Sequence, residues 1–141
     1  MTYQMIYSSQ ASAPMSISDL EEILVDARAG NEARNVTGAL IYVDGVFLQI
    51  LEGEKETLRQ LMRSIGADTR HFSVTVFYEA EVERPMFSNW RMAYVGAQPE
   101  QIAVWAGLEG TAPIAAILQG IQREPQRTSR VIENILKTLA A

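Results

Sequence analysis

The chain has 141 residues, of which 48% are hydrophobic and 21% are charged, a composition typical of one globular domain. Its formal net charge of −5 and its scattered lysines and arginines argue against a dedicated nucleic-acid surface, because phosphate binding requires clustered cations. The absence of cysteine excludes disulfides and Cys-ligated metal centres, and a single histidine excludes a histidine-rich metal site.

No segment has the pattern of a targeting signal or a membrane anchor. The N-terminal stretch MTYQMIYSSQ lacks both a basic region and a long apolar region. No run reaches the ~18 apolar residues that a membrane span requires. We therefore expect a cytoplasmic protein.

The first elements in the chain are a short strand and a helix. The strand is expected to end at residues 5–7, because the small and turn-forming residues of SSQASAP follow it. Ser18 and Glu21 have the spacing of a capping box, and Gly30-Asn31 is the predicted end of the helix. The apolar face of this helix is formed by Leu20, Ile23, Leu24 and Ala27.

A hairpin is predicted next. The strand-like runs 36–43 and 46–51 flank Asp44-Gly45, a strong signal for a two-residue turn, and are expected to pair antiparallel. Both faces of the second run are apolar, which predicts a central strand covered on both sides. Gln49 lies within this run and needs a partner, because an unpaired buried polar group costs roughly 1–3 kcal/mol.

The following segment predicts a second helix and two more strands. Residues 55–65 carry apolar side chains at helical spacing, and residues 72–78 and 90–94 alternate as strands do. The predicted order of elements is therefore βαββαββ.

This order predicts an α+β fold with a ferredoxin-like sheet and one additional strand. Two nested β-α-β crossovers place strand one beside strand three, and we expect this central pair to be parallel, with both helices on one face. The C-terminal third is expected to cover the other face with two helices and a further helical turn near residues 99–105. Its apolar positions are Ile114, Ile117, Leu118, Ile121, Val131, Ile132, Ile135, Leu136 and Leu139.

Several polar and aromatic residues allow more than one interpretation. Tyr7 and Gln49 are expected to face the cleft between the two helices, where hydroxyl and amide can hydrogen bond. Considered singly, they are more simply explained as a polar pair that ties two strands together. Asn31 is more simply a helix C-cap, His71 a loop residue, and Trp90, like Met92, a core residue.

Taken together, these segments resemble the BLUF family of blue-light receptors that use flavin. The resemblance runs from about residue 5 to residue 94 and keeps the order and spacing of the motifs. It rests on IYSSQA, on Leu20, Ile23, Leu24, Ala27, Arg28 and Asn31 of the helix, and on VTGALIY, DG, FLQILEG, DTRH, Phe87 and WRM. The C-terminal third carries no motif, but its length and helical pattern are similar to short, stand-alone BLUF proteins.

The resemblance implies a flavin between the two helices, with its ring edge facing three residues. Tyr7 matches the photoactive tyrosine and Gln49 the switching glutamine. Asn31 matches the residue that hydrogen bonds the ring. Arg70 and His71 match the residues that line the ring and its ribityl-phosphate side.

Further expectations follow from the same resemblance. Trp90 and Met92 match a pair that modulates the site by exchanging places in and out of the pocket. Gly30 departs from the family, because many members carry Asn or His at this position, so we expect one stacking or hydrogen-bonding contact to be missing and the flavin to bind less tightly. Residues 1–97 would form the photosensor domain, and residues 98–141 a helical extension packed on the sheet.

The implied function is blue-light reception without catalytic turnover. Excitation of the flavin would drive electron and proton transfer from Tyr7, and the Gln49 amide would then rearrange its hydrogen bonds to give a reversible, red-shifted state. The signal would pass to a protein partner or change the oligomeric state, because no effector domain is fused to the chain. FAD is the expected flavin and FMN remains possible, since no glycine-rich phosphate loop selects between them.

Two other classes of function use the same cleft. One is a ferredoxin-like oxidoreductase or hydrolase that uses Asn31, Arg70, His71 and Trp90, and the other is a module that binds a small regulatory ligand. The cleft motifs contain no candidate nucleophile and no paired carboxylates, which weighs against an enzyme.

Overall fold

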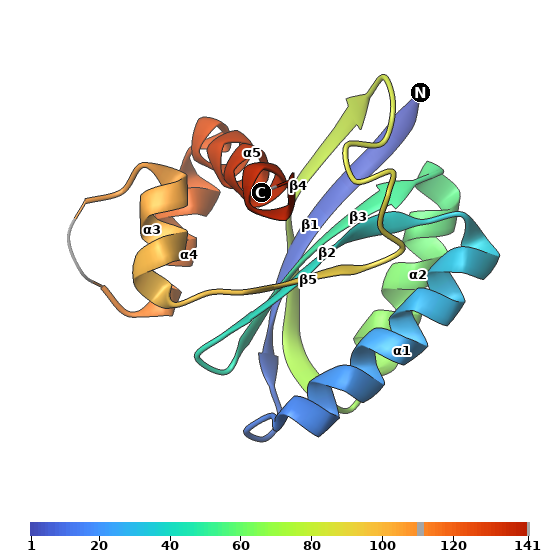
Figure 1. The fold of residues 1–141 in the computed structure, drawn as a ribbon, viewed down its shortest axis with the longest axis horizontal. Coiled ribbons are helices and arrows are strands. Elements are labelled where there is room, and N and C mark those ends of the chain that lie inside the picture. Colours follow the sequence, from blue (N-terminus) through green and yellow to red (C-terminus); the bar gives the residue numbers. More distant parts are fainter. Residues whose placement is uncertain (110–111, 141) are drawn as a thin grey trace.

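The computed structural model describes residues 1–109 and 112–140, and it shows one mixed sheet with helices on both faces (Figure 1). The strands are β1 (Thr2–Ala11), β2 (Thr37–Val43), β3 (Val46–Gly53), β4 (His71–Val82) and β5 (Ala93–Gly96). They lie in the order β4-β1-β3-β2-β5. The helices are α1 (Ile17–Arg34), α2 (Lys55–Ala67), α3 (Pro99–Ala106), α4 (Ile114–Arg123) and α5 (Pro125–Ala140).

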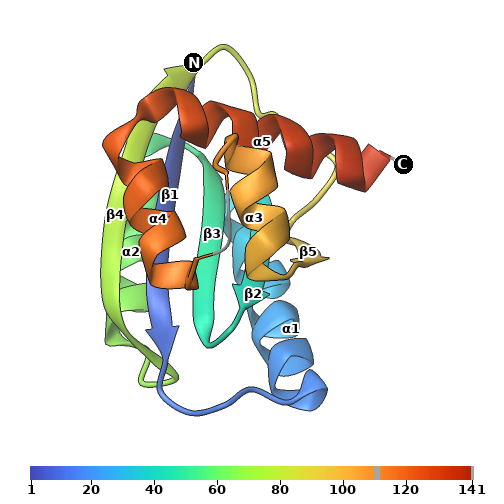
Figure 2. The ribbon, with the colours of Figure 1, turned by 90° about the vertical axis from the view of Figure 1, so that its left-hand side faces the viewer.

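The helices form two groups on opposite faces of the sheet, as predicted. In Figure 2, α3, α4 and α5 lie in front of the strands, and α1 and α2 lie behind them. The predicted βαββαββ order is confirmed, and so is the predicted helix near residues 99–105. Within the described residues, no helix has both the length and the apolar character needed to cross a membrane.

The expected parallel pairing of strands one and three is wrong. β1 and β3 pair antiparallel, and the only parallel neighbours within the described residues are β2 and β5. The crossover through α1 makes β1 parallel to β2, which is not its neighbour. β3 returns through the hairpin in the opposite direction and lies between these two strands, so the contact it makes with β1 is antiparallel.

The Asp44-Gly45 hairpin is confirmed. Both residues have positive φ, 48° for Asp44 and 77° for Gly45, as a type I′ turn requires. Gly38 of the VTG motif has a different reason to be glycine. A Cβ atom at this position would lie 1.9 Å from the backbone oxygen of Ile50, so no larger residue fits between β2 and β3.

Several predicted boundaries differ from the observed ones. The first strand is ten residues long rather than short. Helix α1 is capped by Ser16 with Asp19, rather than by Ser18 with Glu21. It continues past Gly30-Asn31 to Arg34 and is capped by Asn35, which adopts the left-handed conformation with φ of 56°. The helix continues because Asn31 points into the core, where it is 3% exposed, and a core position favours the helix over a local stop signal.

The predicted strand at residues 90–94 is also shorter in the structure. β5 includes only Ala93–Gly96, and residues 90–92 precede it in an irregular segment. The carbonyl oxygens of this segment accept hydrogen bonds from the Gly38 amide and from the side chains of Asn31 and Arg28. These bonds replace the ladder that a longer strand would form.

The sheet separates two apolar layers. The layer beneath α1 and α2 contains Met5, Tyr7, Leu24, Leu40, Phe47, Leu51, Leu58, Leu61 and Met92. The opposite layer contains Ile6, Ile41, Leu48, Ile50 and the predicted apolar positions of the C-terminal helices. Of these helical positions, Leu136 and Leu139 are partly buried and the others are buried. The C-terminal third therefore covers the sheet face as the pattern predicts.

Candidate functional site

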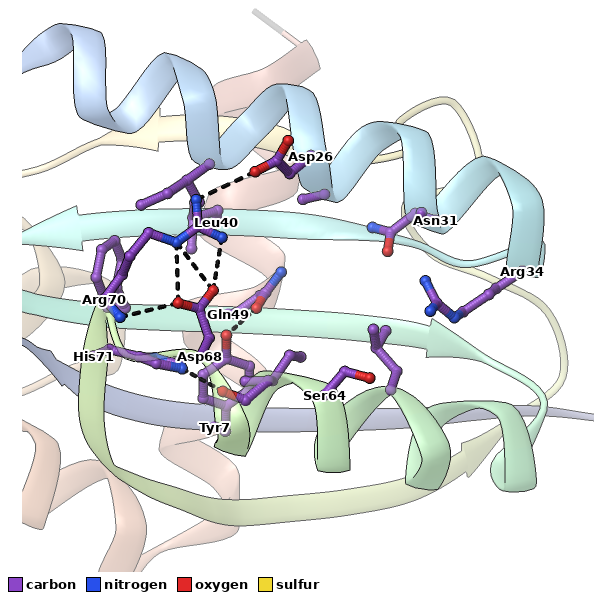
Figure 3. A pocket seen from close by; sticks show the side chains of 16 residues that line it. Tyr7, Asp26, Asn31, Arg34, Leu40, Gln49, Ser64, Asp68, Arg70 and His71 are labelled. Atoms are coloured by element: carbon purple, nitrogen blue, oxygen red, sulfur yellow. Dashed lines mark hydrogen bonds and ion pairs between the residues drawn. The ribbon is translucent and has the colours of Figure 1, made fainter.

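A cavity of about 230 Å³ lies between α1 and α2, over the face of the three central strands (Figure 3). In this view, Asn31 and Arg34 of α1 lie toward one end of the cavity, and Arg70 and His71 lie toward the other. The lining residues combine apolar side chains with amides, carboxylates and guanidinium groups: Tyr7, Ile23, Asp26, Ala27, Gly30, Asn31, Arg34, Leu40, Phe47, Gln49, Leu61, Ser64, Ile65, Asp68, Arg70 and His71.

Tyr7 and Gln49 form a hydrogen-bonded pair in the wall of the cavity. They are direct cross-strand partners on β1 and β3, and the Tyr7 hydroxyl donates to Oε1 of Gln49. Both side chains are buried, at 4% and 6% exposure. Burial raises the pKa of Tyr7 well above its usual value of 10.0, and the Asp68 carboxylate adds to this rise. The hydroxyl is therefore protonated across the ordinary pH range.

Met92 provides the second partner of the Gln49 amide. Nε2 of Gln49 donates to Sδ of Met92 over 3.4 Å, and Met92 is only 1% exposed. Trp90 lies elsewhere. Its ring packs against Phe87, with the ring centroids 6.5 Å apart, in the apolar layer beneath the C-terminal helices. Met92 therefore lies next to the cavity, and Trp90 does not line it. The alternative function as an enzyme placed Trp90 in the same cleft as Asn31, Arg70 and His71, and the structure does not bring it there.

Asn31 connects the cavity to the segment before β5. Nδ2 donates to the backbone oxygen of Arg91 over 2.7 Å, and no described residue donates to Oδ1. The neighbouring turn of α1 makes a similar contact, because Nε of Arg28 donates to the backbone oxygen of Met92 over 3.0 Å. An amide nitrogen has two hydrogens, so Asn31 still offers one donor and one acceptor to a ligand.

Arg70 lies at the rim and is bound by two carboxylates. Its guanidinium contacts Asp68 at 2.6–3.0 Å and Asp26 of α1 at 3.3 Å. The hydrogen bonds from Arg70 lower the pKa of Asp68 below its usual value. The same pairing raises the pKa of Arg70. Arg70 lines the cavity as expected, and it also connects α1 to the turn that follows α2.

His71 has both ring nitrogens engaged. Nδ1 lies 2.7 Å from the Ser9 hydroxyl, and Nε2 lies 2.6 Å from the backbone oxygen of Ile65. Since a carbonyl only accepts, Nε2 carries a proton. The ring is also in edge contact with Tyr7, with the two centroids 6.3 Å apart. His71 therefore fixes one end of the cavity wall next to Tyr7.

Gly30 and Arg34 occupy neighbouring turns of α1 at the other end. A Cβ atom at Gly30 would lie 2.7 Å from Nη1 of Arg34. The Arg34 guanidinium therefore lies close to the position that a side chain at residue 30 would take. No described residue forms an ion pair with Arg34.

Sequence reasoning missed one buried charge close to the site. Glu52 has 0% exposure and follows Gln49 by three residues on β3. The one available signal in the sequence is the position of this carboxylate directly after an apolar run. A charge buried at such a position requires several hydrogen-bond donors around it.

Comparison with known proteins identifies the family. The model of the BLUF family, described as sensors of blue light using FAD, matches residues 2–93. The alpha subunit of photoactivated adenylate cyclase from Euglena gracilis is 37% identical over 103 residues, which are 73% of this chain and 10% of that protein. The beta subunit from the same organism is 36% identical over 104 residues, which are 73% of this chain and 12% of that protein. The chain thus spans about a tenth of the length of these relatives.

Solved structures agree with this assignment. The ground state of BlsA has 30% sequence identity and a TM-score of 0.69, over 77% of this chain and 75% of that one. The dark state of BlrB, a BLUF protein, covers 97% of this chain and 96% of its own with a TM-score of 0.75. At 21% identity, this second match supports the fold alone. Because the family model covers well over half of the residues, the chain belongs to the BLUF family of blue-light sensors.

Proposed function

We propose that this blue-light receptor binds FAD in the cavity between α1 and α2, and that Tyr7 and Gln49 carry out its photochemistry. The observation that carries the proposal is the hydrogen bond from the Tyr7 hydroxyl to Oε1 of Gln49 in the cavity wall. The description of the family as using FAD supports FAD over FMN.

The residues of the cavity fit a flavin. A flavin ring is flat and largely apolar, and one edge alternates carbonyl oxygens with a ring N–H group. Ile23, Leu40 and Ile65 supply apolar walls, and Asn31 and Gln49 supply amides with both donors and acceptors. Such a combination of apolar walls and few polar groups is typical of cofactor sites.

Tyr7 is the proposed source of the electron and the proton. Bound flavin supplies the absorption of blue light and, once excited, a strong oxidant. Tyr7 has a hydroxyl that stays protonated because its pKa is raised, and its hydrogen bond directs the proton to Oε1 of Gln49. The electron and the proton both return to Tyr7 in a back reaction, so the cycle consumes nothing and only the arrangement of the Gln49 amide differs afterwards.

Gln49 is the proposed switch. Met92 sulfur can only accept, so it favours the orientation in which Nε2 of Gln49 faces it and Oε1 faces Tyr7. Rotation or tautomerisation of the amide exchanges the donor and acceptor positions. Each bond of this kind contributes about 1 kcal/mol, so the two arrangements lie close in energy.

We also propose that the chain acts without catalytic turnover and passes its signal to a protein partner. The curated relatives support this, because the chain matches only a small part of two photoactivated adenylate cyclase subunits. Helices α3, α4 and α5 offer a route for the signal, since they cover the sheet face opposite the cavity.

The proposal is tested on the purified full chain. We expect a yellow protein that releases FAD on denaturation and whose absorption band shifts reversibly to the red under blue light. Chromatography of the released flavin distinguishes FAD from FMN. A protein that binds no flavin after reconstitution, or that bleaches without a reversible red shift, would overturn the proposed function.

A further inference from the structure

Glu52 is a fully buried carboxylate whose two oxygens each accept two hydrogen bonds. Oε1 accepts from the Thr37 hydroxyl over 3.1 Å and from the backbone N–H of Phe87 over 2.7 Å. Oε2 accepts from Nε2 of Gln4 over 3.1 Å and from the backbone N–H of Met86 over 2.7 Å. An ionised carboxylate only accepts, and all four partners can donate to it.

The four donors come from separate parts of the chain. Gln4 and Thr37 belong to the strands on either side of β3, and Met86 and Phe87 belong to the connection between β4 and β5. The two backbone bonds are the shorter pair. Glu52 therefore holds the start of an irregular segment, residues 86–92, against the centre of the sheet.

This segment ends at the residue that contacts the switching glutamine. Its last carbonyl groups are bound by the Gly38 amide, Asn31 and Arg28, and its last side chain, Met92, accepts from Nε2 of Gln49. Residues 86–92 lie outside β4 and β5, and within the described residues the bond from the Gly38 amide of β2 to the Trp90 oxygen is the only backbone hydrogen bond that a strand gives to this segment. The position of Met92 thus depends on bonds at both ends of the segment.

We propose that Glu52 is a positioning residue of the photocycle: by binding the backbone N–H groups of Met86 and Phe87, it places Met92 against Gln49. The expected effect of Glu52 on the rate of dark return rests on the proposed function. Its expected effect on the hydrogen exchange of residues 86–92 does not. Glu52 lies on the opposite face of β3 from Gln49. It would support Tyr7 and Gln49, the two residues that are proposed to carry out the photochemistry.

The substitution Glu52→Gln tests this role with little change of shape. An amide has one oxygen and one NH₂ group, and each oxygen of Glu52 accepts from one backbone N–H that cannot reverse its role. Either orientation of the new amide therefore sets an NH₂ group against a backbone donor. One end of the segment must detach from β3 or shift.

Thr37→Val is the matched control. It removes one side-chain donor from the same carboxylate and leaves both backbone bonds in place. A residue that only stabilised the fold would lead to similar behaviour in the two variants. If Glu52 positions the segment, Glu52→Gln should change the hydrogen exchange and the dark return, and Thr37→Val should not.

Two measurements are made on the full chain. In hydrogen exchange, we expect the amides of residues 86–92 in Glu52→Gln to exchange at least ~10-fold faster than in the wild type, while those of β1 and β3 do not change. In the flavin-loaded protein, we expect the rate of dark return to change by about fivefold, the equivalent of one hydrogen bond. Thr37→Val should retain the wild-type values of both.

The outcomes separate the inference from the function on which it rests. Unchanged exchange at residues 86–92, or faster exchange with an unchanged dark return, overturns the positioning role. If Glu52→Gln does not fold, hydrogen exchange of the wild-type protein tests the role instead. Rapid exchange of the Met86 and Phe87 amides would show that Glu52 does not hold them. A wild type without a red shift would overturn the proposed function, and the exchange measurement would still test the contact.

Discussion

Tyr7 and Gln49 face one another across β1 and β3, and the Tyr7 hydroxyl donates to Oε1 of Gln49. Because they are direct partners in an antiparallel pair, their side chains lie on the same face of the sheet. A slip of one residue would turn either side chain to the opposite face, so the sheet register itself sets the contact.

Gln49→Leu should retain the flavin and abolish the spectral switch. Leucine has a similar volume to glutamine, but it has no group that can exchange hydrogen bonds with Tyr7. The Tyr7 hydroxyl loses its partner, and the variant should be less stable by roughly 1–3 kcal/mol. Absorption spectra before and after blue light provide the measurement.

Gln60→Leu is the control for this substitution, because Gln60 is exposed on α2. It should retain the red shift and the stability of the wild type. A red shift that persists in Gln49→Leu, with flavin bound, would mean that Gln49 is not the switch.

Asp68→Asn should show that the contact between Asp68 and Arg70 contributes a pH-dependent part of the free energy of unfolding. The hydrogen bonds from Arg70 lower the pKa of Asp68 in the folded state. The unfolded chain therefore binds more protons near the unfolded pKa of about 3.9, and the stabilisation is present above that value and lost as pH falls through the lower folded pKa. For a partly exposed pair, we expect a loss of about 0.5–1 kcal/mol in the variant near neutral pH.

Urea unfolding of both proteins at a fixed flavin concentration measures this difference. The difference in free energy of unfolding between the wild type and Asp68→Asn should decrease steadily once the pH drops below about 4. A gap that stays constant or widens in acid would show that the charge of Asp68 does not stabilise the fold.

Removal of residues 98–141 should expose an apolar sheet face. The C-terminal helices cover Ile41, Leu48 and Ile50, and these residues are 1–3% exposed in the full chain. We expect the truncated protein to bind flavin and to self-associate, because a large exposed apolar patch favours association. Size-exclusion chromatography tests this, and a truncated protein that stays monomeric would argue against the proposed boundary near residue 97.

Local patterns in the sequence predict much of this fold. The Asp44-Gly45 turn, the faces of the helices and the apolar positions of the C-terminal third all depend on neighbours in sequence, and the structure confirms them. The direction of β1 relative to β3 depends on the whole path of the chain. Our expectation of a parallel pair applied the crossover rule to strands that the crossover does not connect.

The candidate site was predictable in part. The resemblance to BLUF proteins identified Tyr7, Gln49, Asn31, Arg70 and His71, and all five line one cavity. Their roles remain proposals.

Two features close to the cavity were not predictable from the sequence. The role of Glu52 was missed because its donors lie at residues 4, 37, 86 and 87, and no spacing in the sequence shows that they meet. The sequence also left open whether Trp90 or Met92 faces the cavity, because the backbone oxygens of residues 90–92 accept hydrogen bonds from the Gly38 amide and from the side chains of Asn31 and Arg28, in place of the strand that their alternation predicts.

The light-minus-dark difference spectrum of Tyr7→Phe tests the account most directly. The change removes one hydroxyl and keeps the ring, so the protein should fold and bind flavin with the loss of a hydrogen bond worth about 1 kcal/mol. Phenylalanine is far harder to oxidise and has no proton to give to Gln49, so we predict longer-lived flavin fluorescence and no reversible red shift. A variant that is less stable but retains the full red shift would contradict the account, because Tyr7 would then only tie β1 to β3.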